Sequence, residues 1–184
     1  MSIMPKNYNI CVFCGSQSGK NKIFLNTSYE LGVKLSQKGY TIIYGGGKNG
    51  LMGEIARGVL ENNGKLISIV PEYFNKKEIT EKKSSEIINT KSFNQRKEIM
   101  IKKANIFLCL PGGLGTLDEL LEVATLNQLK IINKKIIVID TKNFWDPLKK
   151  LFENLNKKGF LYDFKRSNII FIKSIKKAVE FIEE

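Results

Sequence analysis

The chain has 184 residues, a length that fits a single domain over 1–184 whose core needs neither a metal nor disulfides. Its formal net charge is +12, and it contains no His at all. The lack of His excludes Ser-His-Asp and Cys-His catalysis and the zinc sites that use His.

Short apolar runs alternate with amphipathic stretches along the whole chain. In chain order, the pattern predicts a strand at 8–16, a helix at 23–39, a strand at 40–47, a helix at 50–64, a strand at 65–71, a loop with room for one short helix at 72–85, a short strand at 86–92, a helix at 93–104, a strand at 105–110, a helix at 116–132, a strand at 134–140, a helix at 144–159, a strand at 169–172 and a helix at 174–184. Strands rich in Ile and Val that alternate with helices indicate an α/β layer fold with a mostly parallel sheet flanked by helices. Ligands bind such sheets at the carboxyl ends of the strands.

The three cysteines do not indicate a redox site. Cys11 and Cys14 lie within an apolar run, and their spacing on a strand directs the two side chains to opposite faces. We therefore expect Cys11, Cys14 and Cys109 to be buried thiols in a reducing compartment. No apolar run approaches the roughly 18 residues of a membrane span, and the N-terminus has no signal-peptide core. These features predict a cytoplasmic protein with no membrane partner.

The positive charge has three interpretations. It can reflect genome bias toward Lys, it can attract phosphorylated small molecules, or it can mark a nucleic-acid groove. Only three residues are Arg, and the Lys residues are scattered without interleaved aromatics. Nucleic acid is therefore the least favoured partner.

Three strand-to-helix turns are rich in glycine and are candidates for binding an anion. They contain Gly15 and Ser16; Gly45, Gly46 and Gly47; and Gly112, Gly113, Leu114, Gly115 and Thr116. Glycine lets the backbone approach a phosphate, and the following helix offers free N–H groups at its start. Three such turns at the carboxyl ends of one sheet predict a shared nucleotide crevice.

Residues 45–50, GGGKNG, match the G-x-G-x-x-G pattern of dinucleotide-binding proteins. Glu72, about 20 residues further on, could serve as the acid that binds a ribose. However, the pattern follows the second strand rather than the first, so NAD remains a minor alternative. The chain contains no P-loop motif.

Arg96 and Lys97 lie in the first turn or so of a predicted helix, where a cation opposes the helix dipole. In a chain with few Arg residues, Arg96 indicates an acidic partner, either a ligand phosphate or a protein carboxylate. Lys97 is also explained as a solvated charge.

The run Thr116-Leu117-Asp118-Glu119 fits a capping box, with Thr116 as the cap and Glu119 reaching back to it. A buried stripe is expected on the same helix at Leu117, Leu120, Leu121 and Ala124, with Glu119 at its edge. Glu119 is therefore either occupied within its own capping box or directed into the crevice within reach of Arg96.

Several motifs together resemble one known family. They are VFCGS at 12–16, YGGGKNGLMG at 44–53, RK at 96–97, PGGLGTLDE at 111–119 and ELLEVATLNQL at 119–129. The segment PGGLGTLDE corresponds to the PGGxGTxxE signature of the LOG family, the cytokinin riboside 5′-monophosphate phosphoribohydrolases. RK at 96–97 corresponds to the RK that precedes this signature in the family. Older descriptions of these proteins use the label lysine decarboxylase, but no Lys of this chain stands out as a pyridoxal phosphate ligand.

The resemblance implies a Rossmann-like fold, a homodimer with sites near the interface, and no metal or redox cofactor. It implies hydrolysis of the N-glycosidic bond of a purine nucleoside 5′-monophosphate, AMP or its N6-prenylated form, to the free base and ribose 5-phosphate. Arg96 and Glu119 would be the catalytic pair. The substrate would be bound by the three glycine turns together with Lys97, Asp118 and, near the phosphate, Thr125.

This chain departs from the family at positions that border the base pocket. Phe93, Asn94 and Gln95 stand where relatives often have Met-His before RK, Leu126 replaces a frequent Trp, and Lys134-Lys135 replaces Lys-Pro. The base preference is therefore not fixed by the resemblance. Molybdenum-cofactor carrier proteins look similar in fold and glycine-rich loop, so a carrier that binds a phosphorylated pterin or nucleotide is the alternative to the enzyme.

Overall fold

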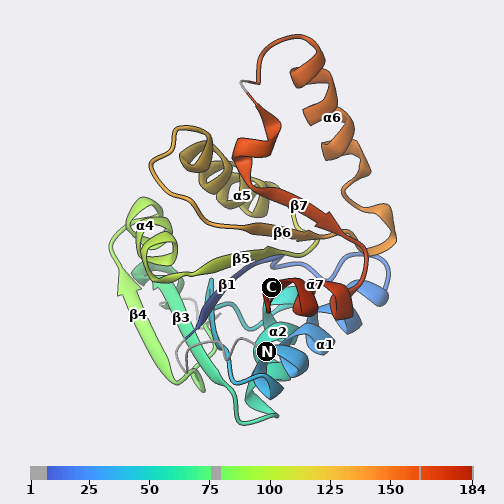
Figure 1. The fold of residues 1–184 in the computed structure, drawn as a ribbon. Coiled ribbons are helices and arrows are strands. Elements are labelled where there is room, and N and C mark those ends of the chain that lie inside the picture. Colours follow the sequence, from blue (N-terminus) through green and yellow to red (C-terminus); the bar gives the residue numbers. More distant parts are fainter. Residues whose placement is uncertain (1–7, 76–79, 162, 184) are drawn as a thin grey trace.

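The computed structural model describes residues 8–75, 80–161 and 163–183, and these form a three-layer α/β fold around one seven-stranded sheet (Figure 1). The strands run in the order β4-β3-β2-β1-β5-β6-β7, and every pair of neighbours is parallel. The predicted fold class is confirmed, and the sheet is parallel throughout. The chain starts in the middle of the sheet and builds outward, first to β4 and then from β5 to β7.

The strands are β1 (Asn9–Phe13), β2 (Thr41–Tyr44), β3 (Lys65–Pro71), β4 (Glu86–Thr90), β5 (Ile106–Cys109), β6 (Ile136–Ile139) and β7 (Ile169–Ile172). The α-helices are α1 (Ile23–Gln37), α2 (Gly50–Leu60), α3 (Glu72–Asn75), α4 (Phe93–Lys103), α5 (Leu114–Gln128), α6 (Asp146–Lys157) and α7 (Ile175–Ile182). Two 3-10 turns, η1 (Thr141–Asn143) and η2 (Phe164–Ser167), complete the described elements.

Each predicted strand and helix is present, and the differences lie at the ends. The sequence left room for one short helix in 72–85, and this helix is α3. Residues 76–79 of that loop lie outside the described residues, and so do 1–7 and Glu184, the last residue of the final predicted helix. The helix predicted at 116–132 was misplaced, because α5 begins two residues earlier and ends at Gln128. The left-handed backbone of Lys130, with φ of 58°, turns the chain away from the helix there.

Two apolar cores fill the spaces on either side of the sheet. Helices α1, α2 and α7 cover one face, and α4, α5 and α6 cover the other (Figure 1). Cys14 belongs to the first core and Cys11 to the second, and all three cysteines are buried and free, as predicted. Within the described ranges, no helix combines the length and the apolar character needed to cross a membrane.

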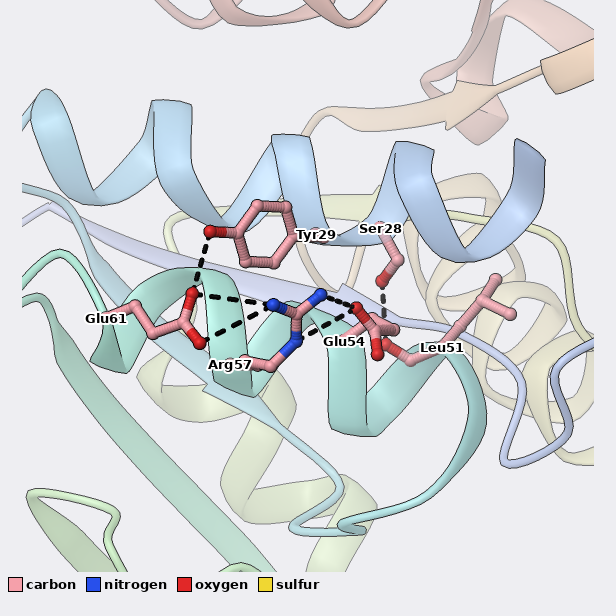
Figure 2. A network of polar contacts seen from close by, with 6 residues as sticks. All are labelled: Ser28, Tyr29, Leu51, Glu54, Arg57 and Glu61. Carbon is pink, nitrogen blue, oxygen red and sulfur yellow. Dashed lines mark hydrogen bonds and ion pairs between the residues drawn. The ribbon is translucent and has the colours of Figure 1, made fainter. Parts of the chain in front are cut away.

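Helices α1 and α2 pack closely because glycines lie at their contact. A Cβ atom at Gly58 would collide with the backbone carbonyl of Tyr29 on α1. Beside this contact, Figure 2 shows the Tyr29 hydroxyl donating to Glu61 over 2.7 Å, with Arg57 paired to both Glu54 and Glu61. At the buried end, the Ser28 hydroxyl donates to the Leu51 carbonyl over 2.7 Å. This contact fixes the start of α2, which borders the cavity described next.

Candidate functional site

The described residues enclose a cavity of about 570 Å³ at the carboxyl ends of the central strands. Its lining includes all three glycine turns, which follow β1, β2 and β5. Because β1 lies between β2 and β5, the chain leaves β1 at the point where the strand order reverses. Loops diverge at such a switch point and leave a crevice, so the predicted location of a ligand site agrees with the sheet order.

Backbone hydrogen bonds join the first glycine turn to the third and to the start of α2, the helix that follows the second turn. The N–H of Gly15 donates to the carbonyl of Pro111 over 3.0 Å, and the carbonyl of Gly15 accepts from the N–H of Met52 over 3.2 Å. A Cβ atom at Gly112 would collide with the Thr116 hydroxyl, so only glycine permits this approach. The floor of the cavity is therefore fixed before any ligand binds.

Helix α5 starts against this floor with an open N-terminus. Its N-cap is Gly113, which has no side chain to accept from the first N–H groups. The N–H groups of Leu114, Gly115 and Thr116 therefore have no acceptor inside the helix, and the positive end of the helix dipole adds to their attraction for an anion. This geometry is suited to a phosphate.

The capping box predicted at Thr116 and Glu119 is wrong. Because the N-cap is Gly113, both residues lie within α5, and the Glu119 carboxylate is bound by a different helix. The predicted stripe was partly wrong as well, since Leu121 is 41% exposed while Leu120 and Ala124 are buried. The inner face of α5 also carries buried polar residues. Thr116 and Glu119 line the cavity, whereas Asn127 lies at the other end of the helix and donates to the carbonyls of Lys134 and Ser167.

Arg96 is the partner of Glu119. One Nη of Arg96 donates to Oε1 of Glu119 over 2.7 Å, and its Nε donates to the carbonyl of Ile69 at the end of β3 over 3.1 Å. The positive charge of Arg96, which opposes the dipole of α4, is thus paired with a protein carboxylate. This is one of the two partners that the sequence predicted for Arg96. A Cβ atom at Gly45 would collide with the guanidinium, so the second glycine turn makes room for Arg96.

The start of α4 is fixed by its cap. Ser92 accepts from the N–H of Gln95 over 3.1 Å, and the side chain of Gln95 accepts from the N–H of Lys91 over 2.8 Å. Ser92 is therefore the N-cap of α4. The cap sets the rotation of the first turn of α4 and so directs Arg96 toward the cavity.

Glu119 carries the buried carboxyl group of the cavity. The residue is 8% exposed, and burial raises its pKa above the ordinary value while the adjacent Arg96 lowers it in part. Burial also raises the pKa of the Cys14 thiol, which lines the cavity close by. Cys14 is therefore an un-ionised, unreactive thiol, and the ionisable chemistry of the site belongs to Glu119 and Arg96.

The structure brings together most of the predicted site residues but not all of them. Those that line the cavity are Gly15, Ser16, Gly45, Gly46, Arg96, Gly112, Gly113, Leu114, Gly115, Thr116 and Glu119. Lys97, Asp118 and Thr125 are not part of the lining. Lys97 is paired with Asp118 and Glu122, and the exposed Thr125 donates to the carbonyl of Leu121. Their assignment to a ligand stays a prediction.

Sequence reasoning missed the aromatic walls of the cavity. Phe24 contacts Phe144 at one place, with ring centroids 5.8 Å apart, and Phe74 contacts Phe93 at another, with centroids 5.5 Å apart. The four residues come from four separate segments, so no periodic pattern links them. The one sequence feature that pointed to these walls was Phe93, which lies just before Arg96 in a segment where relatives often have other residues.

The residues present do not favour a metal or a dinucleotide. In the part of the chain that the structure describes, no three His, Cys, Asp or Glu side chains gather as a metal site. Glu72, the candidate ribose acid for NAD, is exposed on α3 and does not line the cavity. The glycines of 45–50 instead accommodate Arg96 and the start of α2.

Comparison with known proteins gives related sequences over the full chain. Residues 52–182 match the protein family described as "Possible lysine decarboxylase". The chain is 33% identical over 184 residues to a probable cytokinin riboside 5′-monophosphate phosphoribohydrolase of Oryza sativa subsp. japonica, covering 100% of this chain and 75% of that protein. It is 34% identical over 184 residues to a cytokinin riboside 5′-monophosphate phosphoribohydrolase of Arabidopsis thaliana, covering 100% and 86%.

Among solved structures, the molybdenum cofactor binding protein from the phototrophic bacterium Rippkaea orientalis superposes with a TM-score of 0.71. The two chains are 22% identical, and the match covers 96% of each. At this identity the likeness concerns the fold.

Proposed function

The chain belongs to the LOG family of cytokinin riboside 5′-monophosphate phosphoribohydrolases, and we propose that it hydrolyses the N-glycosidic bond of a purine nucleoside 5′-monophosphate. The observation that carries this proposal is the buried Arg96–Glu119 pair beside the open N-terminus of α5. One part of the cavity is suited to an anion and the adjacent part to a developing cation. A nucleotide presents both along its ribose 5-phosphate.

The substrate phosphate binds the N–H groups at the start of α5 and the turn at Gly15 and Ser16. The purine base occupies the apolar part of the cavity, where aromatic side chains supply flat contact surfaces. With the phosphate and base bound in this way, the anomeric carbon, C1′, would lie near the Glu119 carboxylate. AMP and its N6-prenylated form are the substrates that we propose, with the base released free.

Catalysis follows from the charge that develops on the sugar. As the bond between C1′ and the base nitrogen breaks, its electron pair leaves with the base and positive charge spreads over C1′ and the ring oxygen. The Glu119 carboxylate stabilises this charge and orients a water whose oxygen bonds to C1′. The water passes its proton to the Glu119 carboxylate as its oxygen bonds to C1′, and solvent water protonates the departing base nitrogen. Glu119 then returns its proton to solvent, so the net reaction consumes one water. Arg96 keeps Glu119 ionised and correctly aimed.

The residues do not support the decarboxylase that the family description names. Pyridoxal phosphate chemistry requires a lysine that forms a Schiff base inside the site. No Lys is among the described residues that line the cavity. A carrier that only binds a ligand would need no buried carboxylate at the sugar, so the Arg96–Glu119 pair also favours an enzyme.

We further propose a homodimer with the site close to the interface. The outer face of α5 exposes Leu114 and Leu121, and Leu129 just beyond the helix is also exposed. Leu114 belongs both to this face and to the cavity lining. Association through this face would exclude water from the edge of the site.

The direct test is to incubate the purified protein with AMP, GMP, CMP and isopentenyl-AMP and to measure free base by HPLC. We expect release from the purine nucleotides. Glu119→Gln should lower the rate by roughly 10²–10⁴-fold, the range for removing a group that acts in proton transfer. Glu54→Gln, an identical change in an exposed ion pair on α2, should retain the wild-type rate.

Two results would reject the proposal. The first is a wild-type rate in a folded Glu119→Gln or Arg96→Met variant, since it would show that the substituted residue takes no part in the chemistry. The second is failure of the wild-type protein to release base from all four nucleotides, which would favour the carrier alternative.

A further inference from the structure

Two sets of ion pairs join α4 to α5 side by side. Arg96 on α4 pairs with Glu119 on α5 over 2.7 Å. The next residue, Lys97, pairs with the residue before Glu119, Asp118, over 3.0 Å, and with Glu122 one turn further on over 2.7 Å. Arg96 and Glu119 both line the cavity, whereas Lys97, Asp118 and Glu122 are not part of its lining.

The environment of Lys97 differs from that of a solvated surface lysine. Its side chain is only 14% exposed, whereas its partners Asp118 and Glu122 are 62% and 36% exposed. Glu122, and then Asp118, raises the pKa of Lys97 against the opposing effect of burial. The ammonium is thus charged, largely enclosed and bound by two carboxylates, so it is not available to a substrate phosphate.

We propose that Lys97 is a positioning residue, which clamps α4 to α5 through Asp118 and Glu122 and so holds Arg96 and Glu119 at their working separation. This inference rests on the proposed function for its consequences in catalysis. It replaces the direct contact with the nucleotide that resemblance alone assigns to Lys97.

The clamp has an effect because the catalytic contact between the helices is small. Among the described residues, one N–O contact binds Glu119 to Arg96, and the Nε contact to Ile69 is the one hydrogen bond that ties the guanidinium to the sheet. A rotation or slide of α4 relative to α5 would therefore change the direction of the carboxylate. A displacement of about 1 Å in such a group can lower a rate about a hundredfold.

The clamp also carries charge that acts on Glu119. Lys97 lowers the pKa of Glu119 and Asp118 raises it, both more weakly than burial and Arg96 do. The other titratable groups that face Glu119 are the thiols of Cys11, Cys14 and Cys109, which burial keeps neutral. Removal of Lys97 and removal of its acidic partners should therefore shift the titration of Glu119 in opposite directions.

The experiment compares Lys97→Met, Lys97→Arg and a matched control, Lys34→Met, which breaks an exposed ion pair with Glu30 on α1. For Lys97→Met we expect kcat to fall about tenfold with KM unchanged, because orientation rather than binding is lost. The acid limb of its pH profile should move to higher pH. Lys97→Arg should recover kcat, and Lys34→Met should match the wild-type protein.

The double variant Asp118→Asn/Glu122→Gln removes the clamp from the other side and keeps Lys97. Its kcat should fall as well, but its acid limb should move to lower pH, because a carboxylate is lost and the ammonium is left unpaired. A general loss of stability would not produce opposite shifts. If Lys97→Met fails to fold by circular dichroism, this double variant decides the question.

Three outcomes would overturn the inference. They are a raised KM with kcat unchanged in Lys97→Met, wild-type kinetics in that variant, and acid limbs that shift in the same direction in both variants. Titration of ¹³C-labelled glutamate by NMR gives the Glu119 pKa without any substrate. If the wild-type protein releases no base, the proposed function fails, while opposite NMR shifts would still support the clamp and unmoved shifts would reject it.

Discussion

At the scale of single residues, the site depends on the carboxylate of Glu119, which lies in a buried environment that disfavours its negative charge. Burial favours the neutral form of Glu119, and one guanidinium offsets part of that cost. Removing one member of a buried ion pair leaves the other uncompensated, so each residue supports the other. A carboxyl group whose pKa is perturbed by burial and by one charged partner, and which lies in a cavity, is a candidate for a functional role.

The raised pKa of Glu119 predicts the pH dependence of base release. The reaction needs the ionised carboxylate, so kcat/KM should fall as pH drops through the raised pKa. The acid limb should therefore lie above 4.5, the ordinary value for glutamate. The measurement is kcat/KM for AMP across pH, with circular dichroism at each pH as the control for folding. An acid limb at or below 4.5 would mean that another group controls the reaction.

At the scale of elements, the walls of the cavity depend on helix contacts that lie behind it. The Ser28 hydroxyl holds the Leu51 carbonyl at the start of α2, and Met52 donates to Gly15 in the first glycine turn. The close approach at Gly58 makes these contacts possible. The exposed Arg57 pairs of Figure 2 contribute less, because solvent-exposed ion pairs are individually weak.

Gly58→Ala should destabilise the protein, because the added methyl group collides with the Tyr29 carbonyl and separates α1 from α2. We expect a loss of about 1–3 kcal/mol in the free energy of unfolding, the usual cost of overpacking a tight contact. Urea denaturation measures it. The control is Gly115→Ala on α5, where an added Cβ meets no atom within 4 Å and stability should not fall. Equal stability of the two variants would contradict the close contact.

At the scale of the whole molecule, the site exists because distant parts of the chain converge at one edge of the sheet. Its glycine turns follow β1, β2 and β5, and its aromatic side chains come from four segments. The outer face of α5 continues from this edge as an exposed apolar surface. Exposed apolar patches beside a site often mark an interface.

The proposed homodimer predicts a particle of twice the chain mass by light scattering. Leu121→Asp should dissociate it, because a carboxylate would be buried without a partner at the interface. Leu151→Asp on α6 is the matched control, since Leu151 is similarly exposed but lies far along the chain from α5, and this variant should remain a dimer. A monomeric wild-type protein, or equal behaviour of the two variants, would reject α5 as the interface.

The sequence by itself determined the layers and the edge at which the site lies. Alternation of apolar strands with amphipathic helices predicted a parallel α/β sheet, and glycine after three strands predicted a shared crevice at their carboxyl ends. The burial of the three cysteines followed from their apolar neighbours. These features are local, because periodicity and turn chemistry report the two faces and the two ends of one element.

Only the tertiary structure decided how the elements face one another. Spacing alone predicted a capping box for Glu119, whereas its partner is Arg96, 23 residues away on another helix. Local patterns also could not predict that Lys97 pairs with Asp118 and Glu122 on α5, or that aromatic side chains form walls of the cavity. The physical reason is that these contacts depend on where α4 and α5 pack relative to β3 and β5, and the order of strands in the sheet sets that arrangement.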